Sequence, residues 1–132
     1  MAGSGFTQTF AELDAAANRV SHLLRAAGVR PGDHVAICME NHDRYFEITW
    51  GCYYAGAVYT NCSSRLTSGE LAYILNDSKA KVFFTSHYKA DQAAEVLAET
   101  PNVDLRLMLD GTIPGHDSYE AAVAAHPGTP LP

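Results

Sequence analysis

The chain has 132 residues, which is enough for one domain. Apolar residues make up 47% of it and charged residues 18%, so the composition favours a buried core over disorder. Nine Lys and Arg against fifteen Asp and Glu give a net charge of −6, which excludes a general binder of nucleic acid or of anionic membranes.

The cysteines and the hydropathy pattern predict a cytoplasmic protein. Cys38, Cys52 and Cys62 are odd in number, lie far apart and form no CxxC pair, so we expect neither a disulfide framework nor a zinc ribbon. The longest apolar run, 48–59, is shorter than the ~20 residues that a membrane span needs. The residues after Met1 lack the basic and apolar regions of a secretory signal. We therefore expect no transmembrane segment.

A helix and then a strand are predicted at the start of the chain. Thr9 to Glu12 fits a capping box, in which the two side chains satisfy free N–H groups at a helix start. Apolar residues then recur at three- and four-residue steps, as on one helix face, until Gly28 ends the pattern. Residues 34–39 are a nearly all-apolar run, which predicts a strand buried on both faces.

The same alternation continues to residue 125. Asn41 is a suitable N-cap for a helix that ends near Gly56, and Thr67 to Glu70 form a second capping box. Further strands are predicted at 57–60, 81–85 and 105–109, and further helices at 67–75, 88–100 and 119–125. Strands separated by helices predict an α/β fold with a doubly wound, mainly parallel sheet, of the flavodoxin-like or Rossmann-like kind.

The last residues differ in composition from this predicted domain, residues 1–125. The tail 126–132 holds three of the six prolines of the chain and shows no periodicity. We interpret it as a linker toward a part of the protein that this sequence does not contain.

Motifs for catalysis and cofactor binding are missing from the sequence. It contains neither GxGxxG nor GxxxxGK[ST], and the loop after the strand at 34–39 is acidic and free of glycine, which would repel a phosphate. The six histidines show no HExxH-like spacing, and no serine lies in a GxSxG elbow. The sequence itself therefore indicates no catalytic, cofactor-binding or metal-binding residue.

The acidic loop allows two interpretations. Glu40, Asp43 and Glu47 could form an acid–base cluster with His42, near the end of a strand where α/β sheets bind ligands. The favoured interpretation is that these carboxylates complement the dipole of the following helix and face solvent. Cys52, among apolar neighbours, is interpreted as a core residue.

An aromatic cluster is the most unusual local feature. Phe46, Trp50 and Tyr53 or Tyr54 would share one helix face, which favours core packing against the sheet. The alternative is the wall of an apolar ligand cavity or an interface with another domain.

Several linked motifs resemble a known family. The segments TFAELDAAANR at 9–19 and LLRAAGVRPGDHVA at 23–36 resemble the N-terminal signature of the adenylate-forming (AMP-binding, acyl-CoA synthetase) superfamily. The likeness continues in Asn41, in AGAV at 55–58 and in RLTSGELAYILNDSKAKV at 65–82, and it is close over 1–86. Residues 1–5 resemble the hairpin after the first strand of the family, so we expect its opening helix and strand to be missing here.

The resemblance implies the N-terminal part of an ATP-dependent fatty-acyl-CoA ligase, which makes an acyl-adenylate and then an acyl-CoA. Tyr59-Thr60 is similar to bacterial fatty-acyl-CoA synthetases, with a coumarate-type or other carboxylate-activating ligase left open. ATP, Mg²⁺ and CoA would serve the parent enzyme. Its phosphate loop and catalytic lysine do not occur in these residues, so we expect the fragment to be inactive and to bind no cofactor tightly.

The partners implied are the remainder of the ligase chain, with a fatty acid and CoA as substrates. The fragment would supply one wall of the acyl cleft, and the residues we select for it are Trp50, Tyr54, Thr60, Asn61 and Arg65. The alternative is a stand-alone, non-catalytic module that binds a ligand or forms a homodimer. Both hypotheses predict exposed apolar surface.

Overall fold

Five parallel strands form one sheet in the computed structural model, which describes residues 8–40, 42–63 and 65–131. The Asn41 cap and the hairpin at 1–5 lie outside the described residues. The strand order is β2-β1-β3-β4-β5, with every neighbouring pair parallel. The strands are β1 (His34–Cys38), β2 (Val58–Asn61), β3 (Val82–Ser86), β4 (Leu105–Leu109) and β5 (Asp117–Ser118). This arrangement confirms the predicted fold class.

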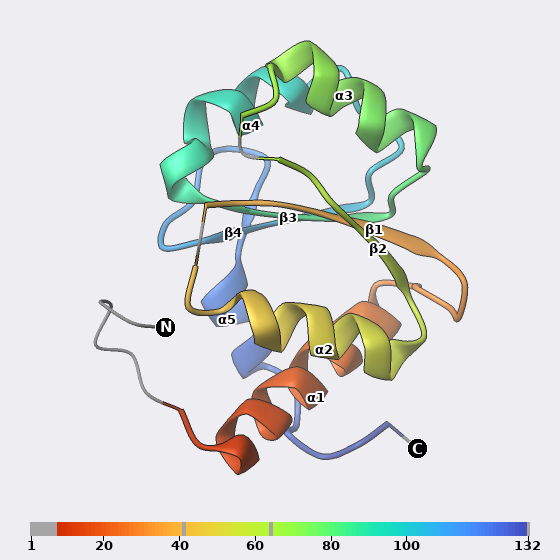
Figure 1. Cartoon of the computed structure of the whole chain (residues 1–132), viewed down its shortest axis with the longest axis vertical. Coiled ribbons are helices and arrows are strands. Elements are labelled where there is room, and N and C mark those ends of the chain that lie inside the picture. The colour runs from red at the N-terminus through yellow and green to blue at the C-terminus, as the bar shows by residue number, and fades with distance from the viewer. Residues whose placement is uncertain (1–7, 41, 64, 132) are drawn as a thin grey trace.

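Helices cover both faces of the sheet, so the molecule has three layers (Figure 1). On one face lie α1 (Phe10–Ala26), α2 (Tyr45–Ala55) and α5 (Tyr119–Ala124), and on the other α3 (Ser68–Asp77) and α4 (Ala90–Leu97), which follows the short 3₁₀ helix η1 (His87–Lys89). Each face has its own core: Val20, Ile37 and Phe84 belong to the first, and Leu71 and Phe83 to the second. Central strands buried on both faces explain their all-apolar sequences.

The local sequence sets most helix ends. The N–H of Glu12 donates to Thr9 Oγ1 at 3.1 Å while the N–H of Thr9 donates to Glu12 Oε1 at 2.9 Å, and Thr67 and Glu70 repeat this geometry. Both predicted capping boxes are therefore confirmed. Gly56 ends α2 in the left-handed conformation, at φ 76°, which a residue without Cβ adopts at little cost.

Three elements differ from their predicted form. The helix predicted at 88–100 is shorter, because 87–89 form η1 and α4 ends at Leu97. The described start of α2 is Tyr45, after an Arg44 N-cap without a side-chain capping bond. The two residues of β5 are too few to give a strand pattern in the sequence.

The tail lies along α1 (Figure 1). Asn18 Nδ2 donates to the carbonyl of Gly128 at 3.2 Å, His22 Nε2 lies 2.8 Å from the carbonyl oxygen of Thr129, and Leu131 packs against the first core. The division of the chain into a domain and a linker stays a prediction.

The cysteines behave as core residues. All three are buried and unpaired, and burial raises the pKa of Cys52 to about 12 and that of Cys62 to about 11. The interpretation of Cys52 as a core residue is confirmed. None of the helices in the described part of the chain combines the length and the apolar character needed to cross a membrane.

Candidate functional site

The packing of α1 on α2 decides which side of α2 remains open. A Cβ on Gly51 would lie only 2.4 Å from Cβ of Val20, so glycine is what allows the two helices to approach this closely. Ile48 and Cys52 face the core and Tyr45 packs against it, while the other aromatic residues of α2 are left on the more open side of the helix.

These aromatic residues line an open groove of about 590 Å³. Its lining contains no charged side chain and consists of Phe10, Tyr45, Phe46, Thr49, Trp50, Tyr53, Tyr54 and Tyr59. We call this feature the aromatic groove. Phe46 is 51% exposed and Tyr53 81% exposed, so the prediction that this face packs in the core is wrong. The structure has the apolar open surface that the alternative interpretation describes.

Contacts between side chains hold the groove in shape. The rings of Phe10 and Trp50 meet edge to face with centroids 5.6 Å apart. The hydroxyl of Tyr54 donates to Asp14 Oδ1 at 2.6 Å, and this bond raises the pKa of Tyr54, because the protonated phenol is the donor. Asn18 lies beside the same carboxylate, with Nδ2 3.4 Å from Asp14 Oδ2. The rim of the groove is thus connected to α1.

The structure brings together two of the five predicted site residues. Trp50 and Tyr54 both line the aromatic groove, whereas its lining in the described residues does not include Thr60, Asn61 or Arg65. Thr60 and Asn61 lie in the edge strand β2, and Arg65 is exposed in the loop that follows.

Sequence reasoning did not select Phe10 for the site, because it is one of the apolar residues that recur at helical spacing in the first predicted helix. It is 72% exposed at the first position of the helix. A residue in the first turn can project past the end of the neighbouring helix, and its spacing alone does not show this.

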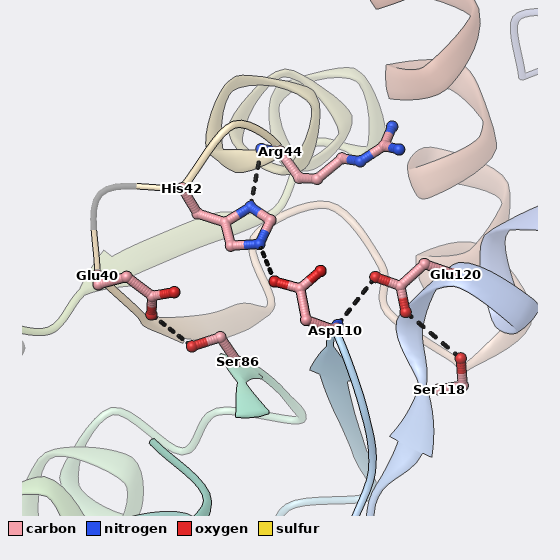
Figure 2. Close-up of polar contacts among 7 residues, drawn as sticks. All are labelled: Glu40, His42, Arg44, Ser86, Asp110, Ser118 and Glu120. Atoms are coloured by element: carbon pink, nitrogen blue, oxygen red, sulfur yellow. Dashed lines mark hydrogen bonds and ion pairs between the residues drawn. The ribbon is translucent and has the colours of Figure 1, made fainter. Parts of the chain in front are cut away.

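A second feature, which is polar, lies where β1, β3 and β4 end (Figure 2). His42 Nε2 is 2.6 Å from Asp110 Oδ2, Ser86 Oγ donates to Glu40, and the N–H of Asp110 donates to Glu120 Oε2 at 3.1 Å. We call these residues the edge cluster. Asp110 was missed, because 68 residues separate it from His42 and only the parallel sheet brings the two strand ends together.

The edge cluster offers the ligand atoms of a metal site, but the proton on the His42 ring is on the wrong nitrogen for binding a metal. Glu40, His42 and Asp110 have ligand atoms within 4.8 Å of one another. However, the backbone N–H of Arg44 donates to His42 Nδ1 at 3.0 Å, so Nδ1 is unprotonated and Nε2 carries the proton toward Asp110. A metal-binding histidine instead donates from its second nitrogen. We interpret the edge cluster as a set of structural hydrogen bonds.

The position of Glu47 differs from the predicted one. It was expected to face solvent in the first turn of a helix, but it is 3% exposed. Tyr119 Oη donates to Glu47 Oε2 at 2.5 Å, and Arg44 Nη1 lies 3.2 Å from Glu47 Oε1. A buried carboxylate needs such partners, which here come from α5 and from the N-cap. The acid–base cluster that would include Glu47 therefore does not form.

The family of the chain follows from its sequence as well as its fold. The family model of the AMP-binding enzymes matches residues 1–130, and the chain belongs to this family. This match confirms the resemblance to the AMP-binding family that the sequence motifs predict.

Known proteins extend this result. The chain is 34% identical to the 3-oxocholest-4-en-26-oate–CoA ligase of Rhodococcus rhodochrous, over 94% of this chain and 23% of the relative. It is 40% identical to the fatty acid–[acyl-carrier-protein] ligase ScoC of Streptomyces coeruleorubidus, over 61% of this chain and 15% of that protein. The crystal structure of the anthranilate CoA ligase AuaEII superimposes with a TM-score of 0.90 at 22% identity, over 96% of this chain and 24% of that one. The chain thus spans less than a quarter of the length of each.

Proposed function

We propose that this chain is the N-terminal part of an ATP-dependent fatty-acyl-CoA ligase of the cytoplasm, which activates a carboxylic acid as its adenylate and transfers the acyl group to CoA. Membership in the AMP-binding family supports this, as do relatives whose names describe ligases that join a carboxylic acid to a thiol carrier. The observation that carries the role of this part is the aromatic groove, an uncharged surface open to an apolar substrate.

The described residues at the strand ends do not fit the phosphates of ATP. The edge cluster presents the carboxylates of Glu40, Asp110 and Glu120 at the strand ends, where an α/β domain would hold phosphate, and carboxylates repel phosphate. His42 is committed as a donor to Asp110. In our proposal the parent enzyme uses ATP, Mg²⁺ and CoA, and this part supplies none of the groups that hold them.

This part instead supplies apolar contact surface for the acyl chain. Trp50 lies in the groove and Tyr54 at its rim, where its bond to Asp14 fixes the ring. Burying apolar area contributes roughly 25 cal/mol per Å². One open wall without a second wall gives weak binding, because much of the ligand stays in water.

The test uses Trp50, the only tryptophan of the chain, as a fluorescent reporter in the groove. Titration with a medium-chain fatty acid should shift its emission, and Tyr54→Ala should weaken the effect several-fold. Tyr73→Ala, an exposed tyrosine of α3 on the other side of the sheet, is the matched control and should change nothing. An emission that does not respond, or responds equally in both variants, contradicts the proposed acyl wall.

Catalysis is tested separately. The chain alone should show no acid-dependent exchange of pyrophosphate into ATP, because the described residues hold no phosphate site. Measurable exchange would contradict the proposed division of roles.

The exposed aromatic side chains also favour a second function, that of a non-catalytic module that forms a homodimer. Val58 and Tyr59 of the edge strand β2 are 46% and 40% exposed, and Tyr59 is part of the lining of the groove. The strand β2 carries no charge or proline that would discourage pairing. Sedimentation equilibrium distinguishes the two: concentration-dependent dimers that Tyr59→Lys abolishes would support the module.

A further inference from the structure

Two of the three cysteines lie opposite each other at the ends of neighbouring strands. Ile37 of β1 pairs in register with Asn61 of β2, and the N–H of Cys62 donates to the carbonyl of Ile37 at 2.7 Å. This bond continues the parallel ladder by one residue, so Cys38 and Cys62 are the next pair. Neighbouring strands lie about 4.8 Å apart, which is within the range of roughly 4.4–6.8 Å over which a disulfide joins two Cα atoms.

The side chains of this pair lie on the same side of the sheet. Both belong to the second core, where Cys38 is fully buried and Cys62 is 5% exposed. Cys38 Sγ lies 3.8 Å from the carbonyl oxygen of Ser63, the residue after Cys62, so this thiol is directed toward the end of β2. Burial, and then the charge that Cys38 carries as a thiolate, raise the pKa of Cys62, which is consistent with two neighbouring sulfurs. Cys52 belongs to the first core, on the other side of the sheet.

The end of β2 has room to adjust. As an edge strand of the described sheet, β2 pairs with β1 alone, so a small shift of Cys62 toward Cys38 disturbs no second strand. The chain after Cys62 is held by a side chain of α4, because Gln92 Nε2 donates to the carbonyl of Leu66 at 2.6 Å. Gln92 Oε1 also lies 3.9 Å from Cys38 Sγ. Cys38 thus lies beside the residues that position this loop.

We propose that Cys38 and Cys62 form a disulfide under oxidising conditions, which attaches the chain after β2 covalently to the end of β1. The oxidant is a small disulfide such as oxidised glutathione. The Cys62 thiolate attacks it and forms a mixed disulfide, as the S–S bond of the oxidant breaks and one glutathione leaves. The sulfur of Cys38 then attacks that of Cys62 and releases the second glutathione. Two cysteine thiols are oxidised, the oxidant is reduced, and the two thiol protons pass to the two glutathione molecules.

The reduced pair is protected in the closed fold. Burial raises the pKa of Cys38 and of Cys62, so both remain thiols near neutral pH and react slowly. The exchange therefore takes place while the end of β2 is open, during folding or local unfolding. A reducing cytoplasm keeps such thiols reduced, so the disulfide is a response to oxidation and not a permanent part of the fold. It does not depend on the proposed function.

Refolding tests the pairing without requiring access to buried thiols. The reduced chain is unfolded in urea and diluted into a mixture of reduced and oxidised glutathione. The three free thiols should fall to one, and the mass should show the loss of two hydrogen atoms and no bound glutathione. Trypsin cleaves after Arg25, Arg44 and Arg65 but not before Pro31, so the digest should contain peptide 26–44 linked to peptide 45–65.

Variants assign the bond, because peptide 45–65 contains both Cys52 and Cys62. Cys52→Ala is the matched control, since it removes a buried thiol from the other core, and it should keep the linked peptides. Cys62→Ser should abolish them. If Cys62→Ser does not fold, the digest of Cys52→Ala alone decides the assignment, because Cys62 is then the only cysteine in its peptide.

Stability provides a second measurement. A disulfide constrains the unfolded chain, so Tm of the oxidised chain should lie several degrees above that of the reduced chain, and dithiothreitol should reverse the difference. The proposal is overturned if the refolded chain keeps three free thiols or if Cys52→Ala loses the linked peptides. It is also overturned if oxidation lowers Tm, because the bond would then force the strand ends out of their native positions.

Discussion

The helices α2 and α3 cover opposite faces of the same sheet but meet solvent in different ways. The outward side of α3 carries Glu70, Asn76 and Asp77 beside a single exposed aromatic residue, Tyr73. The outward side of α2 carries an almost continuous aromatic surface. Water solvates the polar side of α3 well and the aromatic side of α2 poorly. The outward side of α3 is therefore typical of a solvent-exposed helix, whereas that of α2 is suited to contact with a ligand or another surface.

The two helices also begin differently. The start of α3 is held by the local capping box of Thr67 and Glu70. The start of α2 has no side-chain cap, and Glu47 in its first turn is bound instead by Tyr119, which lies 72 residues away. Local sequence therefore stabilises α3, and tertiary contacts stabilise α2. The following variants test this contrast.

The largest effect is expected on the inner face of α2. Gly51→Ala would place a Cβ 2.4 Å from Val20 and 2.9 Å from the carbonyl oxygen of Ala17, so the helices must separate, at a cost of about 3 kcal/mol of unfolding free energy. Gly69→Ala in α3 is the matched control, because no atom lies within 4 Å of its added Cβ, and it should be neutral or slightly stabilising. Urea denaturation measures both. Equal effects would show that α1 and α2 are not closely packed.

Tyr119→Phe should destabilise the start of α2. It removes the donor to the buried carboxylate of Glu47, at a cost of about 2 kcal/mol. Burial raises the pKa of Tyr119 well above its usual value, so the hydroxyl is a donor at any ordinary pH. Thermal unfolding measures the loss, with Tyr73→Phe as an exposed control that should leave Tm unchanged. A Tm equal to that of the wild type would contradict the role of this bond.

Thr67→Ala should have a smaller effect, at the start of α3. The loss of one capping bond costs about 1 kcal/mol, and Thr67→Ser should restore most of it, because serine offers the same oxygen. Hydrogen exchange of the N–H of Glu70 should become faster in the alanine variant. An unchanged exchange rate would mean that other contacts hold this end.

The outer face of α2 should tolerate change. Tyr53→Ser removes a side chain that is 81% exposed, so the free energy of unfolding should change by less than about 0.5 kcal/mol. Binding of the apolar dye ANS should fall, because the aromatic groove loses part of its lining. Tyr73→Ser should leave dye binding unchanged. A large loss of stability in Tyr53→Ser would mean that this face belongs to the fold.

The candidate site was only partly predictable. Trp50 and Tyr54 could be selected because aromatic residues at helical spacing form a local pattern. The exposure of these side chains could not be predicted in the same way. It depends on the close approach of α1 at Gly51, because this packing decides which face of α2 the core covers. Aromatic residues on a core face and on an open face have the same spacing in the sequence, so only the tertiary structure distinguishes the two.

The sequence by itself determined the α/β alternation, the ends of α1 and α3 and the family of the chain, because capping boxes, buried strands and signature motifs are all built from residues close in the chain. The tertiary structure alone decided that Glu47 is buried against Tyr119, that His42 binds Asp110, and that Arg106 lies beside His116. Each of these pairs joins residues from different strands, helices or the loops that follow or precede them. Their contacts depend on the order of strands in the sheet, and no local pattern in the chain encodes that order.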